Sequence, residues 1–197
     1  MVSDMTDAKE DLHRYLRLGR DAMVWKLDGL SEYDIRRPLT PTGTNLLGLL
    51  KHNASVGLGY FGETFGRPSD IPLPWYAEDK MNDNLDMFAE EHESKEFILD
   101  FWDKAWAHAD ATIEELPLDA EGQVAWWPPE RGPVTLHMIL VHVATEVHRH
   151  AGHADIVREL IDGTAGLRAE VDNMPTGDRS WWDDYRLRLQ AIAEGVR

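Results

Sequence analysis

Apolar residues recur at spacings of three and four along most of this chain, as they do on the buried face of an amphipathic helix. The pattern predicts long helices over residues 4–30, 45–61, 93–116 and 135–162. A short additional helix is predicted near the end of the chain, from Trp181 to Ile192. No segment shows a convincing two-residue alternation of the kind that marks a strand. We therefore expect an all-α protein built as a helical bundle.

Segments that contain proline and glycine separate the predicted helices. The longest, residues 66–92, is too irregular for a helix, and a loop of this length inside a compact domain is commonly a site wall or lid. A surface excursion packed by Trp75 is the alternative. Because residues 164–178 form another such connector, we divide the chain into two parts. They are a helical bundle over 1–165 and an extension over 166–197, whose short helix is expected to pack on the bundle.

The predicted helix 135–162 carries ionisable side chains on its apolar side. A helix advances about 100° per residue, so positions four apart differ by only about 40° around the axis. His142, Glu146 and His150 therefore form a column, with His153 about 20° from Glu146. The apolar residues on or beside this column are Ile139, Val143, Val147, Ala154, Val157 and Ile161. A carboxylate and imidazoles aimed at a core must be paired or bound to a metal.

Glu146 and His150 are the candidate metal ligands on this helix, and a third ligand must come from another segment. His52 is the best candidate, because it is the only histidine of the predicted second helix and lies on its apolar side. Three protein ligands leave one position for water or substrate, as in catalytic sites. By geometry, His153 could replace His150, and His142 could extend the column. The alternatives are a buried network that pairs Glu146 with histidines, and a core role for His52.

The predicted second helix also contains glycines, Gly48 and Gly59 among them, on the side that carries His52. Each glycine inside a helix costs about 1 kcal/mol relative to alanine. A close helix contact, or the approach of a ligand, would explain why they are there.

Composition and charge limit the reactions and the partners that fit this chain. None of the 197 residues is cysteine, so the chain offers no disulfide and no thiolate, and any thiol chemistry needs a sulfur supplied by a ligand. A formal net charge of −16 argues against nucleic acid and anionic membranes as partners. No apolar run approaches the roughly 18 residues of a membrane span, and the chain does not open with a signal peptide, so we expect a cytoplasmic protein.

His13 lies among polar residues and is expected at the surface.

The segment from residue 142 to 163 contains Glu146-Val-His-Arg-His150-Ala-Gly-His153. It resembles the signature helix of the DinB/YfiT-like superfamily, and more narrowly of its mycothiol S-transferase-like branch. The segment 46–52 is similar to the helix that carries that family's first metal ligand. The resemblance extends over roughly residues 8–163. It implies an up-down-down-up four-helix bundle, often dimeric, with one divalent metal ion.

Much of the superfamily uses three histidines as ligands, whereas this chain has Glu146 four residues before His150. This matches the His/Glu/His triad of mycothiol-dependent maleylpyruvate isomerase, so the resemblance implies His52, Glu146 and His150 as the metal ligands. Imidazole and carboxylate ligands suit zinc, with nickel or iron as the other candidates.

The resemblance implies a metal-dependent thiol S-transferase. The metal would activate a low-molecular-weight thiol, mycothiol above all, for transfer to an electrophilic substrate or for thiol-assisted isomerisation. His153, Arg149 and Trp75 are the candidates for supporting the ligands or contacting a substrate. The expected partners are therefore small molecules, and a homodimer is implied by the family. The alternatives are a hydrolase in which the metal activates water, and a metal-containing module that binds a ligand or partner without catalysis.

Overall fold

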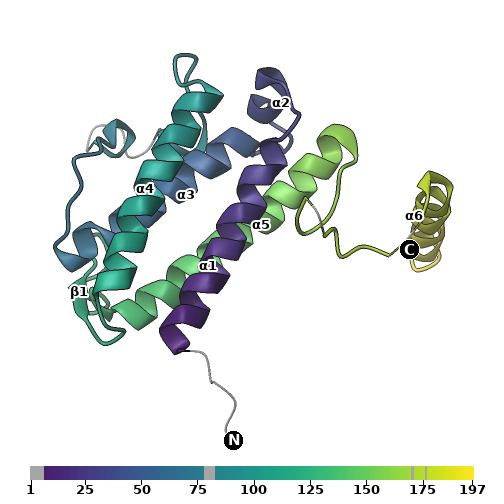
Figure 1. The fold of residues 1–197 in the computed structure, drawn as a ribbon. Helices are drawn as coiled ribbons and strands as arrows, with labels where there is room; N and C mark the ends of the chain where they lie inside the picture. Colours follow the sequence, from purple (N-terminus) through teal and green to yellow (C-terminus); the bar gives the residue numbers. More distant parts are fainter. Residues whose placement is uncertain (1–6, 78–82, 170, 176) are drawn as a thin grey trace, which may run out of the picture.

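The computed structural model describes residues 7–77, 83–169, 171–175 and 177–197. Its long helices are α1 (Ala8–Val24), α3 (Leu46–Phe61), α4 (Lys95–Glu115) and α5 (Leu136–Asp162). The shorter helical elements are η1 (Trp25–Leu27), α2 (Glu32–Arg36), η2 (Glu63–Phe65), η3 (Pro74–Tyr76) and η5 (Leu85–Met87). The predicted helical bundle is confirmed (Figure 1). The first helix is shorter than predicted, and its predicted start at residue 4 lies outside the described residues.

The long helices run up, down, down and up in chain order (Figure 1). α1 packs mainly on α5, and the two are parallel. The carbonyl of Tyr15, in α1, meets His148 of α5, while Lys26, just beyond α1, pairs with Asp155 further along α5. The first and last helices of the bundle are therefore neighbours in space.

α3 and α4 are also parallel. Lys51 pairs with Glu93, just before α4, while Gly62 at the other end of α3 lies beside His108. Parallel neighbours in sequence need a connection that returns the chain along the bundle, and residues 62–94 provide it. α5 crosses α3 in the opposite direction (Figure 1). This crossing is where the predicted site residues meet.

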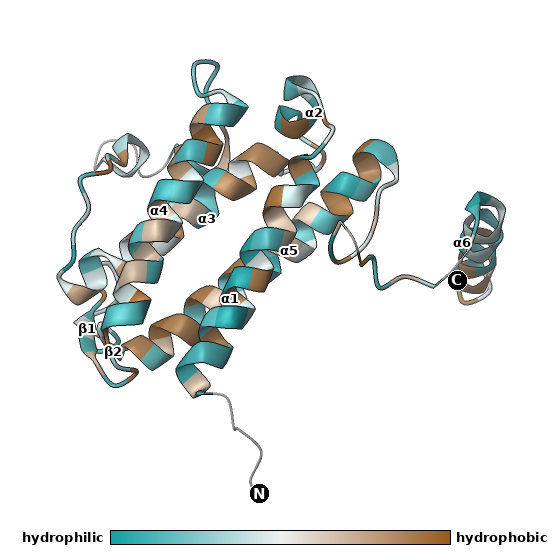
Figure 2. Ribbon diagram, in the orientation of Figure 1, coloured by the Kyte–Doolittle hydropathy of each residue, from teal (hydrophilic) through white to brown (hydrophobic). Residues whose placement is uncertain are grey.

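A continuous core joins the long helices. Its fully buried side chains include Leu16, Met23, Leu50, Ile98, Ile113, Ile139 and Val143. Hydrophilic positions lie along the outward faces of α1 and α4 (Figure 2). This separation of faces is what the spacing of apolar residues predicts. Among the described helices, none combines the length and the apolar character needed to cross a membrane.

Two short strands, β1 (Glu121–Gln123) and β2 (Pro133–Thr135), pair antiparallel between α4 and α5. The sequence pattern predicts no strand here, because three residues are too few to show a two-residue alternation. The loop between the strands brings Trp127 to the end of α3, where its indole N–H donates a hydrogen bond to Tyr60.

The C-terminal helix α6 (Arg179–Glu194) lies apart from the bundle and contains no buried residue (Figure 1). The connector before it is held to the bundle by Lys26, which donates a hydrogen bond to the carbonyl of Gly166. Beyond this anchor, the apolar residues of α6, such as Trp181 and Ile192, are exposed. This arrangement differs from the predicted packing of the extension on the bundle. An apolar stripe predicts a helix, but it does not say which surface covers that helix.

A largely buried ion-pair network joins α1 to α4. Arg20 donates two hydrogen bonds to Asp110, at 2.8 and 3.0 Å, and His13 Nε2 donates a third at 2.7 Å. His13 is only 6% exposed, so its predicted surface position is wrong. Its partner lies 97 residues away and leaves no sign in the local pattern. Burial would raise the pKa of Asp110, but the hydrogen bonds from His13 and Arg20 lower it to about 2.

This network predicts how the free energy of unfolding depends on pH in the acid range. Because the folded pKa of Asp110 lies below the unfolded value of about 3.9, its stabilisation is complete above that value and is lost as the pH falls toward about 2. Asp110→Asn should lower the free energy of unfolding at neutral pH by about 2 kcal/mol, and its deficit against wild type should shrink between about pH 4 and pH 2. Urea unfolding followed by circular dichroism measures both values.

Asp100→Asn is the matched control on the same helix, because Asp100 is 60% exposed and pairs with Lys104 at the surface. It should cost less than about 0.5 kcal/mol. A deficit for Asp110→Asn that stays constant down to about pH 2 would contradict the interpretation.

Candidate metal centre

The crossing of α3 and α5 brings His52, Glu146 and His150 together. One potential ligand atom from each lies within 4.8 Å of the other two. Glu146 Oε1 is 3.0 Å from His150 Nε2 and 3.5 Å from His52 Nε2. All three side chains are partly buried, with exposed fractions of 18% for His52, 32% for Glu146 and 12% for His150. The three side chains predicted from the sequence therefore converge at one point.

The second nitrogen of each imidazole is also held in place. His52 Nδ1 lies 2.7 Å from Asp86 Oδ2, and His150 Nδ1 lies 3.3 Å from His153 Nδ1. Histidines that bind metals commonly use their other ring nitrogen in this way, which fixes the orientation and tautomer of the ring. Both rings consequently direct Nε2 toward Glu146.

The two carboxylates around His52 hold its ring between them. Burial would raise the pKa of Asp86, but the hydrogen bond with His52 lowers it below its ordinary value, so Asp86 is a carboxylate that only accepts. His52 therefore donates through Nδ1, and its Nε2 is the ring atom that faces Glu146. Burial would also raise the pKa of Glu146, yet the nearby His150 lowers it. His52 Nε2 and the carboxylate of Glu146 thus face each other at 3.5 Å, a position in which both could bind one cation.

This set of donors fits a divalent cation. Burial lowers the pKa of His150, which favours the neutral form of the ring that a metal ligand requires. Bonds of about 2.0–2.2 Å around a tetrahedral zinc ion place neighbouring ligand atoms about 3.4 Å apart. The separations of Glu146 Oε1 from the two imidazoles are close to this value. Two imidazoles and one carboxylate also leave a coordination position open.

A close contact with the start of α3 positions the segment that carries Asp86. Asn45 Nδ2 donates to the carbonyl of Met87 at 3.1 Å, and Asn45 Oδ1 accepts from the Gly48 N–H at 2.7 Å. A Cβ atom at position 48 would lie 1.8 Å from the Met87 carbonyl oxygen, so only glycine fits here. The sequence predicts a close helix contact or a ligand at this glycine, and the structure places the backbone at the end of the short η5 turn there.

Two cavities meet at the triad, and His52 and Glu146 line both. The first has a volume of about 720 Å³, and its lining includes the polar side chains of Thr42, Asn45 and Arg149. The second has a volume of about 810 Å³, and its lining includes Val56, Leu58, Tyr60, Ile71, Leu73 and Trp126. The triad can thus be reached from a polar side and from a more apolar side.

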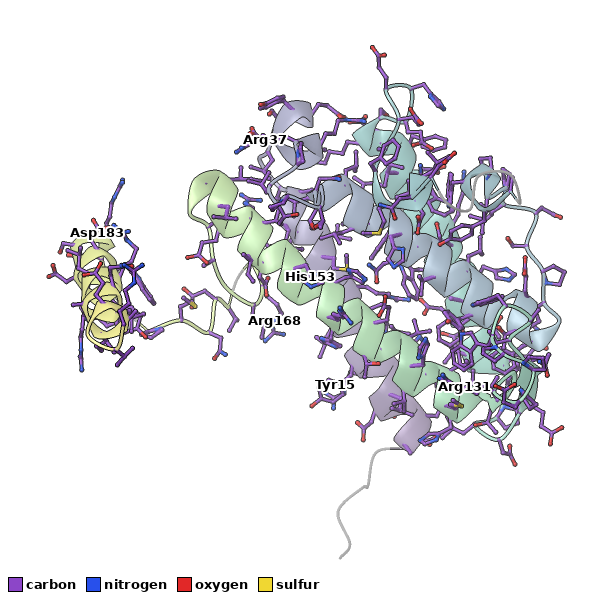
Figure 3. The ribbon with its side chains drawn as sticks, turned by 180° about the vertical axis from the view of Figure 1, so that it is seen from behind. Tyr15, Arg37, Arg131, His153, Arg168 and Asp183 are labelled. Atoms are coloured by element: carbon purple, nitrogen blue, oxygen red, sulfur yellow. The ribbon has the colours of Figure 1, made fainter. Side chains whose placement is uncertain are left out.

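The other predicted site residues lie in different settings. Arg149 lines the first cavity, and His153, labelled midway along α5 in Figure 3, contacts His150. Trp75 is 5% exposed and lies in the core, where its indole N–H donates to Ser55 and its ring meets the edge of Phe101. These contacts give Trp75 a packing role.

A comparison with models of known protein families identifies the family to which this chain belongs. A model of the family described as Mycothiol-S-transferase matches residues 11–163. The chain belongs to this family. The resemblance drawn from the start of α3 and from α5 is therefore confirmed.

Among solved structures, the mycothiol S-transferase family chain resembles one described as the crystal structure of the conserved protein of locus from Enterococcus faecalis. The TM-score is 0.56 and the sequence identity 16%, with 81% of this chain and 100% of that chain covered. This likeness supports the fold alone. No curated protein matches the chain.

In this mycothiol S-transferase family member, the sequence pattern does not reveal Asp86 or the role of Tyr60. Asp86 lies in an irregular stretch, where spacing carries no information about a partner. Tyr60 lies in a correctly predicted helix, but the groups at its hydroxyl, Trp127 and His142, come from distant segments.

The contact at Gly48 gives a test of how Asp86 is positioned. Gly48→Ala should lower the free energy of unfolding by about 1–3 kcal/mol, because the added methyl group overlaps the Met87 carbonyl. Gly152→Ala is the control, because a Cβ at that exposed position of α5 meets nothing within 4 Å, and alanine favours a helix by up to about 1 kcal/mol. Chemical denaturation compares the two variants. Equal stabilities would show that the segment carrying Asp86 is not fixed by this contact.

Proposed function

We propose that this protein is a divalent-metal-dependent thiol S-transferase. The metal ion, with zinc favoured, would be held by His52, Glu146 and His150, and the thiol would be mycothiol or a similar low-molecular-weight thiol. The observation that carries the proposal is the convergence of these three side chains within the region that matches the family. The lack of cysteine fits a reaction in which the thiol comes from a cosubstrate.

A bound zinc ion would lower the pKa of a thiol so that thiolate forms near neutral pH. The side chains around the site balance the charge of the ion and orient its ligands. Glu146 offsets one unit of the cation's charge, while Asp86 and His153 hold the two imidazoles in the orientation that a ligand needs.

The first cavity is suited to the polar part of a sugar thiol. Its lining includes the hydroxyl of Thr42 and the guanidinium of Arg149, which can both hydrogen-bond to sugar hydroxyl and amide groups. Its volume of about 720 Å³ falls within the range of about 300–1,000 Å³ that small-molecule sites occupy. The thiol would thus approach the triad from the polar side.

Metal content tests the ligand set. Untagged protein should contain about one divalent ion per chain by elemental analysis, and His52→Ala or His150→Ala should weaken metal affinity at least about 10-fold. His137→Ala, at an exposed position on α5, should leave the metal content unchanged. Equal metal content in His52→Ala and wild type would support the alternative, a hydrogen-bonded network without metal.

Thiol dependence tests the reaction. Incubating the metal-loaded protein with 1-chloro-2,4-dinitrobenzene and mycothiol should yield the S-aryl conjugate by mass spectrometry, and omitting mycothiol should abolish turnover. Conversion of the aryl chloride to 2,4-dinitrophenol, with water displacing chloride in the absence of thiol, would favour metal-assisted hydrolysis. Absence of turnover with mycothiol and with other small thiols would favour a non-catalytic binding module.

A further inference from the structure

The second cavity differs from the first in the chemistry of its wall. Much of that wall is apolar, made by Val56, Leu58, Ile71, Leu73 and Trp126. Trp126 is 47% exposed and packs beside α3 at Gly59, with two ring carbons 3.6 and 4.0 Å from where a Cβ atom would be. Its ring offers a flat surface against which another aromatic ring can pack. The cavity is therefore suited to an apolar molecule that contains an aromatic ring.

One polar group in this cavity is positioned from two sides. Tyr60 lines the cavity, and its hydroxyl oxygen lies 3.0 Å from Trp127 Nε1 and 3.2 Å from His142 Nε2. An indole N–H can only donate, so Trp127 would stabilise negative charge on the phenolic oxygen when its proton leaves. His142 also lines the cavity, and burial lowers its pKa, so the neutral ring can exchange a hydrogen with Tyr60.

We propose that the second cavity binds an aryl-substituted epoxide and that Tyr60 donates a proton to the oxygen released when the epoxide ring opens. This inference rests on the thiol transfer proposed above. Because Glu146 and His52 line both cavities, a thiol entering from the first cavity meets an electrophile held in the second at the triad. Placing the two reactants on opposite sides of one point is the orientation that a bimolecular displacement needs.

The atoms and charges of the step balance. The thiol loses its proton to solvent, and the thiolate sulfur attacks one epoxide carbon as the carbon–oxygen bond breaks. The electron pair of that bond goes to the oxygen, which takes the proton of the Tyr60 hydroxyl. Tyr60 recovers a proton from solvent through His142. The product is a β-hydroxy thioether, and no oxidant or reductant is needed.

The proposal predicts that the need for Tyr60 depends on the leaving group. Ring opening of an epoxide releases a basic alkoxide, which gains from a proton donor in the transition state. Displacement of chloride from an aryl halide releases a stable anion that needs no proton. A residue with a merely structural role would affect both reactions alike.

Tyr60→Phe provides the test, because it removes the hydroxyl and keeps the ring. With mycothiol and styrene oxide, kcat should fall about 100-fold, within the range of general acid catalysis, while KM changes less than about 3-fold. With 1-chloro-2,4-dinitrobenzene, kcat should fall less than about 3-fold. The matched control is Tyr33→Phe, because Tyr33 is 73% exposed and lies outside the residues that line the cavity. Equal losses with both substrates would overturn the role of Tyr60.

A binding measurement separates this inference from the proposed function. Calorimetric titration of the protein with 1-phenylethane-1,2-diol, without any thiol, should give saturable binding that Trp126→Ala weakens at least about 5-fold. Failure of the diol to bind, or binding that Trp126→Ala leaves unchanged, would overturn the cavity assignment even if thiol transfer to other electrophiles occurs. Diol binding that depends on Trp126, in a protein without thiol transfer, would overturn the proposed function and the protonation step but keep the cavity assignment.

Discussion

The antiparallel crossing of α3 and α5 is the constraint on which the candidate site depends. It places one imidazole of α3 against a carboxylate and an imidazole that lie one turn apart on α5. At this depth an unpaired charge is costly, so the three groups must share a proton or a cation. The packing of α1 on α5 opposes rotation of this helix of 27 residues, so the backbone keeps Glu146 and His150 on the side that faces α3. The hydrogen bonds of His52 with Asp86 and of His150 with His153 then hold the two rings in place.

The connection between α3 and α4 matters as much as the helices. Because these two helices are parallel, the chain must travel back along the bundle, and on that path it delivers Asp86 to the outer nitrogen of His52. The same path supplies Ile71 and Leu73 to one cavity and Met87 to the other. A bundle with short hairpin connections would have the same helices but would lack these walls. The direction of the helices thus determines the surroundings of the site.

The spacing of residues was enough to predict the long helices and the side of α5 that carries Glu146 and His150, because helical periodicity is a local property. It also selected His52, the only histidine of its helix. It could not find Asp86 or the buried position of His13, because each depends on a partner far away in the sequence. The exposed helix α6 shows the same limit of prediction from residue spacing. Periodicity identifies an apolar face, whereas the surface that covers it is decided by the rest of the molecule.

The pairing of α1 with α5 has a consequence for biosynthesis. Tyr15 and His148 touch although 133 residues separate them, so the main partner of the first helix is the last one of the bundle to be translated. At about 5–20 residues per second, α1 leaves the ribosome on the order of ten seconds before α5. Contacts between residues so distant along the chain also slow folding, because a large loop must close first. During this interval, the apolar face of α1 is available to chaperones, and the nascent bundle completes only when α5 is released.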